Sequence, residues 1–282
     1  MKKVLVTGAT GFIGNYVVED LLQKGFKVIA TSSNIKKATR CNWFSSVAYI
    51  PLDIKSFSAG TDYFSFFNKP DLVIHLAWEG LPNYKNEFHL TENLPRHFQL
   101  IKNLISNGLT DLTVTGTCFE YGMQEGELTE ETPAMPGNPY AKAKDELRKK
   151  IEALQHQHPF SFKWLRLFYM WGEGQNPKSL TSQLEAALRN GDAVFNMSGG
   201  EQVRDFLPVE TVAEYIVKAA TQKKTDGIIN ICSGRPVTVK DFVTGYLRQR
   251  DKQIELNLGF YPYPDFEPMR FWGSNKKLNS IK

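Results

Sequence analysis

The segment NPYAKAKDEL, residues 138–147, holds two residues that could move a proton together. Tyr140 and Lys144 are four positions apart, so on an α-helix their side chains share one face and can meet. A neighbouring ammonium favours phenolate and would pull the phenol pKa down from its ordinary value of about 10. The pair is therefore a candidate for acid–base catalysis. Two polar residues on a solvated helix face would show the same spacing. Other parts of the chain must therefore decide between a catalytic pair and an ordinary helix surface.

A second candidate is a glycine-rich turn near the start of the chain. In TGATGFIG, residues 7–14, Gly8, Gly11 and Gly14 stand between a short apolar run and a segment with helical periodicity. Glycines let the backbone turn tightly and approach a pyrophosphate, and the N–H groups that begin the next helix hold its charge. The pattern predicts a dinucleotide-binding turn; the alternative is a tight turn with no ligand.

Strands and helices alternate along the first part of the chain. Apolar residues recur at helical spacing over 13–21, 94–105 and 140–154, and Pro95 predicts a kink or a helix start. This alternation predicts an α/β fold, a doubly wound parallel (Rossmann) sheet with right-handed crossovers. The predicted strands are KKVLVTG (2–8), FKVIATS (26–32), VAYIPLDI (47–54), DLVIHLAW (71–78), LTVTGT (112–117) and FSFKWLRLF (160–168).

Beyond residue 170, Gly and Pro interrupt short elements, which predicts a smaller, discontinuous C-terminal substrate domain. The helix PVETVAEYIVKAA, residues 208–220, is expected to return to the first domain. We therefore expect a dinucleotide-binding domain over 1–169 and 205–230, and a substrate domain over 170–204 and 231–282.

Composition narrows the class of protein. The chain has 282 residues, 41% hydrophobic and 23% charged, which is typical of a globular protein. Its net charge of +4 is mild and unclustered, so we expect neither a nucleic-acid partner nor a membrane partner. Cys41, Cys118 and Cys232 show no C-x-x-C spacing, and no metal site is expected. Without a signal-peptide pattern or an apolar span, a cytoplasmic location is predicted.

Together these motifs resemble the extended short-chain dehydrogenase/reductases, the NAD-dependent epimerase/dehydratase family. TGTCFEYG (115–122) resembles the family's Ser/Thr segment, and RLFYMWG (166–172) the strand end that closes over the nicotinamide. VRDFLPVETVAEYI (203–216) and INICSGRPVTVKDFV (229–243) resemble segments of the nucleotide-sugar members. The resemblance spans nearly the whole chain.

The resemblance implies roles for individual residues. Tyr140 would give a proton to a carbonyl oxygen, Thr117 would bind that oxygen, Lys144 would hold the nicotinamide ribose, and Asn93 would be structural or hold a relay water. The implied cofactor-binding residues are Gly8, Thr10, Gly11, Phe12, Ile13, Gly14, Ser32, Ser33, Asp53, Ile54, Leu76, Ala77, Thr115, Tyr140, Lys144 and Phe168. The implied substrate residues are Trp78, Thr117, Tyr169, Arg204 and Arg270.

Simpler readings of these residues stay open. Thr117 could be a polar strand-end residue, Asn93 could make a helix hydrogen bond, and Arg204 and Arg270 could form salt bridges inside the second domain. Cys118 has no histidine at an obvious spacing, which disfavours a nucleophile.

The end of the second strand bears on the choice of cofactor. NAD-specific folds place an acidic residue there for the ribose 2′-OH. The segment TSSNIKKATR (31–40) has no carboxylate, and the first one after it is Asp53. Ser32 and Ser33 could bind a 2′-phosphate, and Lys36, Lys37 or Arg40 could supply positive charge. These three basic residues could also be ordinary surface. The sequence predicts NADP, with NAD possible.

Sugar dehydratases of this family keep Asp and Glu directly after the catalytic threonine, where this chain has Cys118 and Phe119. Glu120 stands one place too late, so dehydration is disfavoured. The expected activity is NADPH-dependent reduction of a nucleotide-linked 4-keto-6-deoxyhexose, for deoxysugar donors of surface polysaccharide such as O-antigen, by a homodimer. The alternatives are a nucleotide-sugar 4-epimerase with tightly bound NAD, and a catalytically inactive cofactor-sensing regulator, which would be expected to lose the Tyr–Lys pair.

Overall fold

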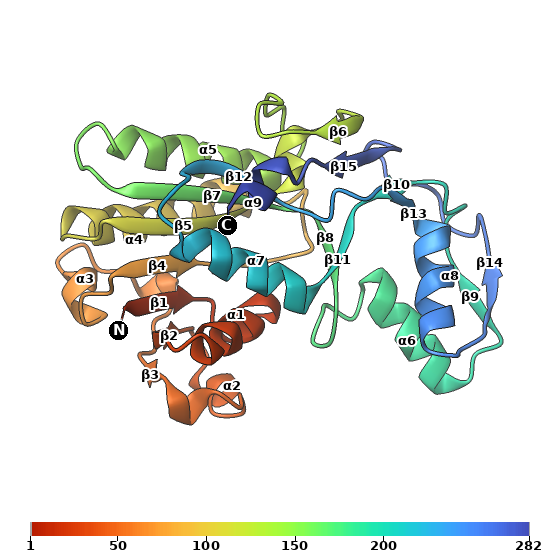
Figure 1. Cartoon of the computed structure of the whole chain (residues 1–282), viewed down its shortest axis with the longest axis horizontal. Coiled ribbons are helices and arrows are strands. Elements are labelled where there is room, and N and C mark those ends of the chain that lie inside the picture. The colour runs from red at the N-terminus through yellow and green to blue at the C-terminus, as the bar shows by residue number, and fades with distance from the viewer. Residues whose placement is uncertain (1, 282) are drawn as a thin grey trace.

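A computed structural model describes residues 2–281 and shows a large α/β lobe beside a smaller lobe (Figure 1). The large lobe holds a seven-stranded parallel sheet in the order β12-β7-β5-β4-β1-β2-β3. The predicted α/β, Rossmann-like fold is confirmed. The strands are β1 (Lys3–Thr7), β2 (Lys27–Thr31), β3 (Ala48–Tyr49), β4 (Leu72–His75), β5 (Asp111–Thr117), β7 (Ser161–Leu167) and β12 (Gly227–Ile231).

Helices cover both faces of this sheet. Val4 and Val6 of β1 point into a core formed with α1 (Phe12–Gln23) and α7 (Val209–Thr221). Leu5, between them, points into the opposite core, formed with α4 (Leu94–Ser106) and α5 (Pro139–Leu154). This two-sided burial explains the continuous apolar runs that predict the strands. The large lobe also contains two short helices, α2 (Ile35–Ala38) and α3 (Tyr63–Phe66).

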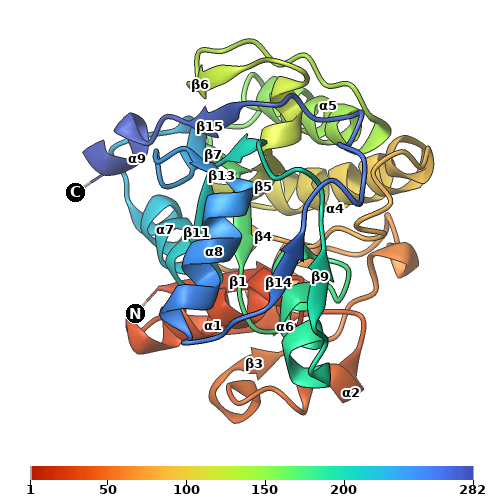
Figure 2. The ribbon, with the colours of Figure 1, turned by 90° about the vertical axis from the view of Figure 1, so that its right-hand side faces the viewer.

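The smaller lobe is built from short elements (Figure 2). Its core includes Leu184 of α6 (Leu180–Asn190) and Val243 of α8 (Val239–Gln249). Its paired short strands are β8 (Tyr169–Trp171) with β11 (Phe206–Pro208), β9 (Val194–Asn196) with β14 (Glu255–Asn257), and β10 (Val203–Arg204) with β13 (Val237–Thr238). A further pair, β6 (Gly126–Leu128) with β15 (Phe271–Gly273), packs against residues that follow β5 and β12 of the large lobe.

Some local predictions differ from the structure. The strand expected over 47–54 is reduced to Ala48–Tyr49, although the N–H groups of Ile50 and Leu52 still bond the carbonyls of Ala30 and Ser32. A 3-10 helix follows at Ile54–Ser56. Pro95 lies in the first turn of α4, directly after a π-helical turn at His89–Asn93, so it marks a helix start.

The C-terminal boundary is also corrected. The short helix α9 (Lys276–Ser280) brings Leu278 and Ile281, each 1% exposed, into the core between the sheet and α7. Placing 276–281 with the substrate domain was therefore wrong. A helix this short carries too little periodicity to reveal where it packs.

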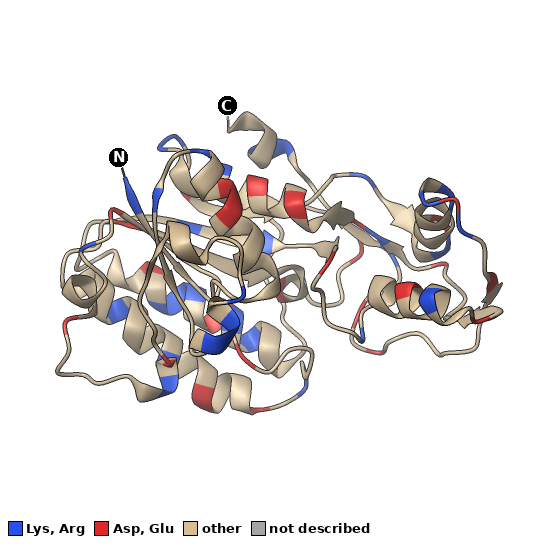
Figure 3. Cartoon of the chain, turned by 90° about the horizontal axis from the view of Figure 1, so that it is seen from below, with Lys and Arg blue, Asp and Glu red and all other residues tan. Residues whose placement is uncertain are grey.

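Basic and acidic residues are interspersed over both lobes (Figure 3). Within residues 2–281, no helix is long and apolar enough to cross a membrane.

Leu278→Ala should lower the free energy of unfolding by about 2–5 kcal/mol, because it leaves a cavity in the main core. Urea unfolding followed by circular dichroism measures the change. Leu258→Ala is the matched control, since Leu258 is 38% exposed and its truncation should cost less than about 0.5 kcal/mol. Equal effects of the two substitutions would contradict the placement of α9 in the core.

Candidate active site

Most of the predicted site residues lie at the carboxyl ends of the parallel strands, where open α/β sheets bind ligands. Three neighbouring cavities lie there, which we call the β2 cavity, the Tyr140 cavity and the Arg204 cavity. Lining the β2 cavity are Gly8, Thr10, Gly11, Ser32, Ser33, Asp53, Ile54, Leu76, Ala77, Trp78 and Asn93. Lining the Tyr140 cavity are Gly8, Gly11, Phe12, Ile13, Gly14, Leu76, Trp78, Thr117, Tyr140, Phe168 and Tyr169. Tyr169 and Arg204 line the Arg204 cavity.

The glycine turn offers bare backbone to the first two cavities. Gly8 has φ +70°, and a Cβ there would lie 2.8 Å from the backbone nitrogen of Ala77. A Cβ on Gly14 would lie 2.2 Å from the carbonyl oxygen of Gly8. Side chains are therefore excluded where the turn meets the start of α1. The arrangement fits the pyrophosphate of a dinucleotide, which backbone N–H groups and the helix dipole would hold.

Tyr140 lies in the first turn of α5, whose N-cap Asn138 accepts a hydrogen bond from the N–H of Ala141 at 2.9 Å. The backbone N–H of Tyr140 donates to the carbonyl of Tyr84 at 3.1 Å, so a loop from the β4 end rests on this turn. The phenol is 7% exposed.

Burial is the main cause that raises the pKa of Tyr140, followed by the nearby Tyr84, Glu120 and Cys118, while a hydrogen bond with Thr117 lowers it. The expected lowering of this pKa is therefore wrong for the protein alone. Desolvation disfavours phenolate more strongly than the surroundings favour it.

Lys144 is 2% exposed and bonds the backbone rather than the phenol. Its Nζ donates to the carbonyl of Thr115 at 2.8 Å and lies 4.1 Å from the centroid of the Trp78 ring. Burial lowers the pKa of Lys144 to about 7, and the charge of Glu120 opposes this shift. Neither Lys144 nor Thr115 is among the residues that line the three cavities, so Lys144 lies behind the cavity walls.

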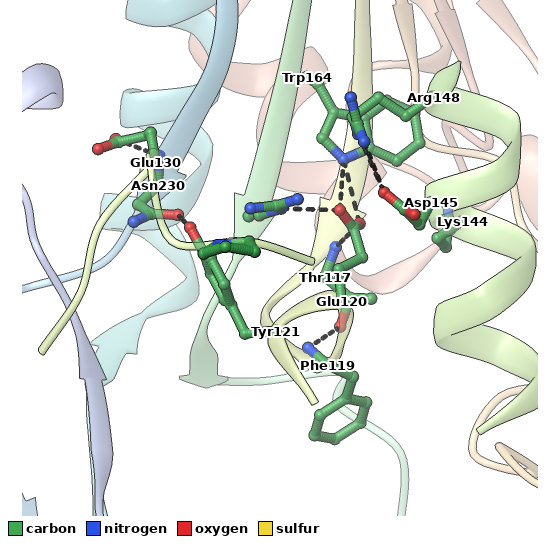
Figure 4. A network of polar contacts seen from close by, with 12 residues as sticks. Thr117, Phe119, Glu120, Tyr121, Glu130, Lys144, Asp145, Arg148, Trp164 and Asn230 are labelled. Atoms are coloured by element: carbon green, nitrogen blue, oxygen red, sulfur yellow. Dashed lines mark hydrogen bonds and ion pairs between the residues drawn. The ribbon is translucent and has the colours of Figure 1, made fainter. Parts of the chain in front are cut away.

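Thr117 is held at the end of β5 by Glu120, a role that the sequence did not reveal (Figure 4). The fully buried carboxylate accepts hydrogen bonds from the N–H of Thr117 at 2.8 Å, from Trp164 Nε1 at 3.0 Å and from Arg166 Nε at 2.8 Å. The Thr117 hydroxyl in turn accepts from the N–H of Phe119 at 3.3 Å. A threonine three residues before a glutamate was the available signal, because it forms a capping box.

Asn93 has structural partners. Its Nδ2 donates to the carbonyl of Glu79 at 3.1 Å and lies 3.4 Å from His89 Nδ1. Asn93 ends the π-helical turn and also lines the β2 cavity, so its geometry fits the helix-bonding alternative as well as a relay role.

The two predicted substrate arginines differ. Arg204 is 3% exposed, and its Nε and Nη2 reach Glu267 Oε2 at 3.2 and 2.8 Å. The Tyr169 hydroxyl donates to the same oxygen at 2.6 Å. Arg204 thus forms the salt bridge that was the simpler alternative, although it lines a cavity. Arg270 is exposed and lies outside the linings of the three cavities.

An aromatic cluster beside Tyr140 was missed. The Tyr84 ring lies 5.6 Å from Tyr140, 5.1 Å from Phe119 and 6.0 Å from Phe266. Tyr84 and Phe119 line the Tyr140 cavity, and none of the residues lining it carries a formal charge. The aromatic-rich tail was the only sequence signal for Phe266.

At the β2 end, Ser32 Oγ lies 2.9 Å from the hydroxyl of Tyr49. Of the three candidate basic residues, only Lys37 lines the β2 cavity. Within residues 2–281, no group of three or more His, Cys, Asp or Glu side chains could hold a metal ion.

Comparison with known proteins places the chain in a family. The NAD dependent epimerase/dehydratase family model matches residues 4–232. A dTDP-6-deoxy-L-talose 4-dehydrogenase (NAD(+)) of Aggregatibacter actinomycetemcomitans is 28% identical over 272 residues, 96% of this chain and 99% of that protein. A UDP-glucose 4-epimerase of Halalkalibacterium halodurans is 25% identical over 264 residues, 85% of this chain and 78% of that protein.

The solved structures agree on the fold. The UDP-glucuronic acid 4-epimerase from Bacillus cereus, in complex with UDP-glucuronic acid and NAD, has a TM-score of 0.83 at 24% identity, covering 99% of this chain and 92% of that one. The predicted resemblance to extended short-chain dehydrogenase/reductases is confirmed. The chain belongs to the NAD dependent epimerase/dehydratase family and is an enzyme with oxidoreductase-type chemistry.

Proposed function

We propose that this enzyme uses NADPH to reduce the 4-keto group of a nucleotide-linked 4-keto-6-deoxyhexose. The observation that carries the proposal is the lining of the Tyr140 cavity. It presents a buried phenol and the Thr117 side chain among apolar and aromatic residues, with no formally charged side chain. A carbonyl at C4 would meet the phenol and the hydroxyl, and a C6 methyl group would meet an apolar wall.

The chain's own residues would hold the dinucleotide across two cavities. The glycine turn and the start of α1 would bind the pyrophosphate. Ser32, Ser33 and Lys37 would bind a 2′-phosphate in the β2 cavity, where the carboxylate of an NAD-specific clamp is missing from the strand end. Bound there, the reduced nicotinamide supplies the hydride.

Tyr140 and Thr117 would act on the carbonyl oxygen. Because its pKa is raised, Tyr140 stays protonated at neutral pH, which is the form that donates a proton in reduction. Thr117, held in place by Glu120, would donate a hydrogen bond to the same oxygen and stabilise its developing charge. Lys144 would contact the nicotinamide ribose and keep the local field positive.

Dehydration lacks its acid and base here. Cys118, whose thiol pKa is raised by burial, and Phe119 occupy the positions that would need carboxylates. Glu120 is committed to Thr117, Trp164 and Arg166 and does not line the cavity.

The substrate nucleotide would extend into the Arg204 cavity, where Phe206 and Phe242 stack 3.9 Å apart. Arg204 would exchange part of its pairing with Glu267 for a phosphate. The relative named for a dTDP-6-deoxysugar, matched over 96% of this chain, supports the 6-deoxy class. We also propose a cytoplasmic homodimer that serves surface-polysaccharide synthesis.

A nucleotide-sugar 4-epimerase is the second candidate, because relatives of that name match most of the chain. An epimerase must rotate its keto intermediate between two hydride transfers. Tyr84 and Phe119 line the Tyr140 cavity, and the Tyr84 ring lies 5.6 Å from the Tyr140 ring. We propose that these bulky rings hinder such a rotation, which favours reduction.

Tyr140→Phe should lower kcat about 10²–10⁴-fold, because it removes the proton donor, while the dissociation constant for NADPH changes little. Lys144→Met should weaken both turnover and NADPH binding. Steady-state kinetics and cofactor fluorescence measure the two effects. A Tyr140→Phe enzyme that keeps most of its kcat would remove the phenol from the mechanism.

Lys37→Ala should lower kcat/KM for NADPH about tenfold or more and leave kcat/KM for NADH nearly unchanged, since a charge-assisted hydrogen bond to the 2′-phosphate is lost. Lys36→Ala is the matched control, because Lys36 does not line the β2 cavity. If the wild-type enzyme uses NADH and NADPH equally well, the proposed phosphate site is wrong.

Purified protein should carry little bound nucleotide, and each product molecule formed from a nucleotide 4-keto-6-deoxysugar should consume one NADPH. Absorbance at the nicotinamide band and product chromatography give the ratio. Interconversion of two nucleotide hexoses without net cofactor oxidation would reject reduction in favour of epimerisation.

A further inference from the structure

Trp78 stands where two of the cavities meet. It follows the end of β4 and lines both the β2 cavity and the Tyr140 cavity, together with Gly8, Gly11 and Leu76. Its residue is partly buried, and its ring forms a T-shaped pair with Tyr140 at a centroid distance of 6.1 Å. A dinucleotide that spans both cavities has to pass this indole.

The indole is fixed in orientation from two sides. Trp78 Nε1 donates to His89 Nδ1 at 3.1 Å. Indole is only a donor, so His89 Nδ1 accepts, and the His89 proton on Nε2 goes to the carbonyl of Asn83 at 3.1 Å. On the other side, Trp78 stacks on His97 with ring centroids 4.7 Å apart and planes 23° apart. The ring that faces Lys144 is therefore held rigidly.

Few groups compensate the charge of the buried Lys144 ammonium. Its Nζ has one hydrogen bond, to the carbonyl of Thr115, and the Trp78 ring centroid lies 4.1 Å away. The charged group that attracts it is Glu120, which follows β5. The ionisable groups of other elements that interact with its charge are His75 of β4, His89 of the π-helical turn and His97 of α4. Burial lowers the pKa of all three histidines, so they stay uncharged at neutral pH. On α5 itself, burial raises the pKa of Tyr140, which stays protonated.

We propose that Trp78 is a positioning residue of the catalytic centre, whose indole face holds the Lys144 ammonium charged and aligned toward the dinucleotide. The electron-rich ring face stabilises a cation most strongly where water is excluded, as it is around Lys144. The inference rests on the cofactor-binding role proposed for Lys144, but not on the identity of the sugar.

The test measures the dissociation constant of NADPH by its fluorescence as a function of pH, without any sugar substrate. Lys144 loses its charge as pH rises through its pKa, so NADPH binding should weaken on that side of the profile. Trp78→Leu should move the midpoint of this limb down by about one unit, and Trp78→Phe by less, because its ring face is weaker. Lys144→Met should abolish the limb.

The matched control is Phe98→Leu. Phe98 of α4 forms a cation–π pair with Lys150 of α5 at 5.8 Å, the same interaction between elements of the same core but outside the cavities. Phe98→Leu should leave the midpoint unchanged. If Phe98→Leu and Trp78→Leu both move the midpoint, a general loosening of the packing between α4 and α5 explains the shifts, and that result would overturn the inference.

Two further results separate the possible failures. If Lys144→Met removes the limb but Trp78→Leu leaves its midpoint in place, the role of Trp78 is rejected and that of Lys144 stands. If Lys144→Met keeps the wild-type profile, the proposed role of Lys144 is wrong and the inference fails with it. Should Trp78→Leu not fold, Trp78→Phe decides the question, and an unmoved midpoint rejects the proposal.

Discussion

The carboxylate of Glu120 is the constraint on which the catalytic arrangement depends. A buried charge is tolerated only when its hydrogen-bonding capacity is met, and Glu120 meets it with groups from β5 and β7. The space around it is filled so closely that a Cβ on Gly116 would lie 2.2 Å from Trp164 Nε1 and 2.4 Å from Glu120 Oε1. The end of β5 is therefore held in a single position, and Thr117 is held there with it.

The same charge shapes the chemistry next to it. The Glu120 charge raises the pKa of Lys144, against the effect of burial, and it raises the pKa of Tyr140, in the same direction as burial. It therefore favours an ammonium beside a neutral phenol. That combination suits a site that must present a proton to a carbonyl oxygen while it holds an anionic cofactor. The fully buried His75 and His97 stay neutral and do not compete for the cofactor's charge.

The sequence was sufficient for the parts of the site that depend on local pattern. The glycine turn, the parallel strands and the Tyr140–Lys144 spacing follow from periodicities of a few residues. The structure brings the glycine turn and Tyr140 to one cavity at the carboxyl ends of the strands, with Lys144 bonded to the Thr115 carbonyl nearby. Tyr84, Phe266 and Glu267 could not be found this way, because loops far apart in the chain carry them. The direction of the Tyr140 pKa shift was mispredicted for a related reason: the sequence names the neighbouring ammonium but not the depth of burial, and here burial dominates.

The central claim is that hydride from exchangeable NADPH reaches C4 of a nucleotide-linked 6-deoxysugar while Tyr140 supplies the proton. NADPH deuterated at the transferred position of the nicotinamide C4, mixed with a nucleotide 4-keto-6-deoxysugar, tests it most directly. Mass spectrometry and NMR of the product should show one deuterium at C4 per molecule. Product without deuterium, formed while the added cofactor stays reduced, would contradict the account and point to a tightly held internal cofactor.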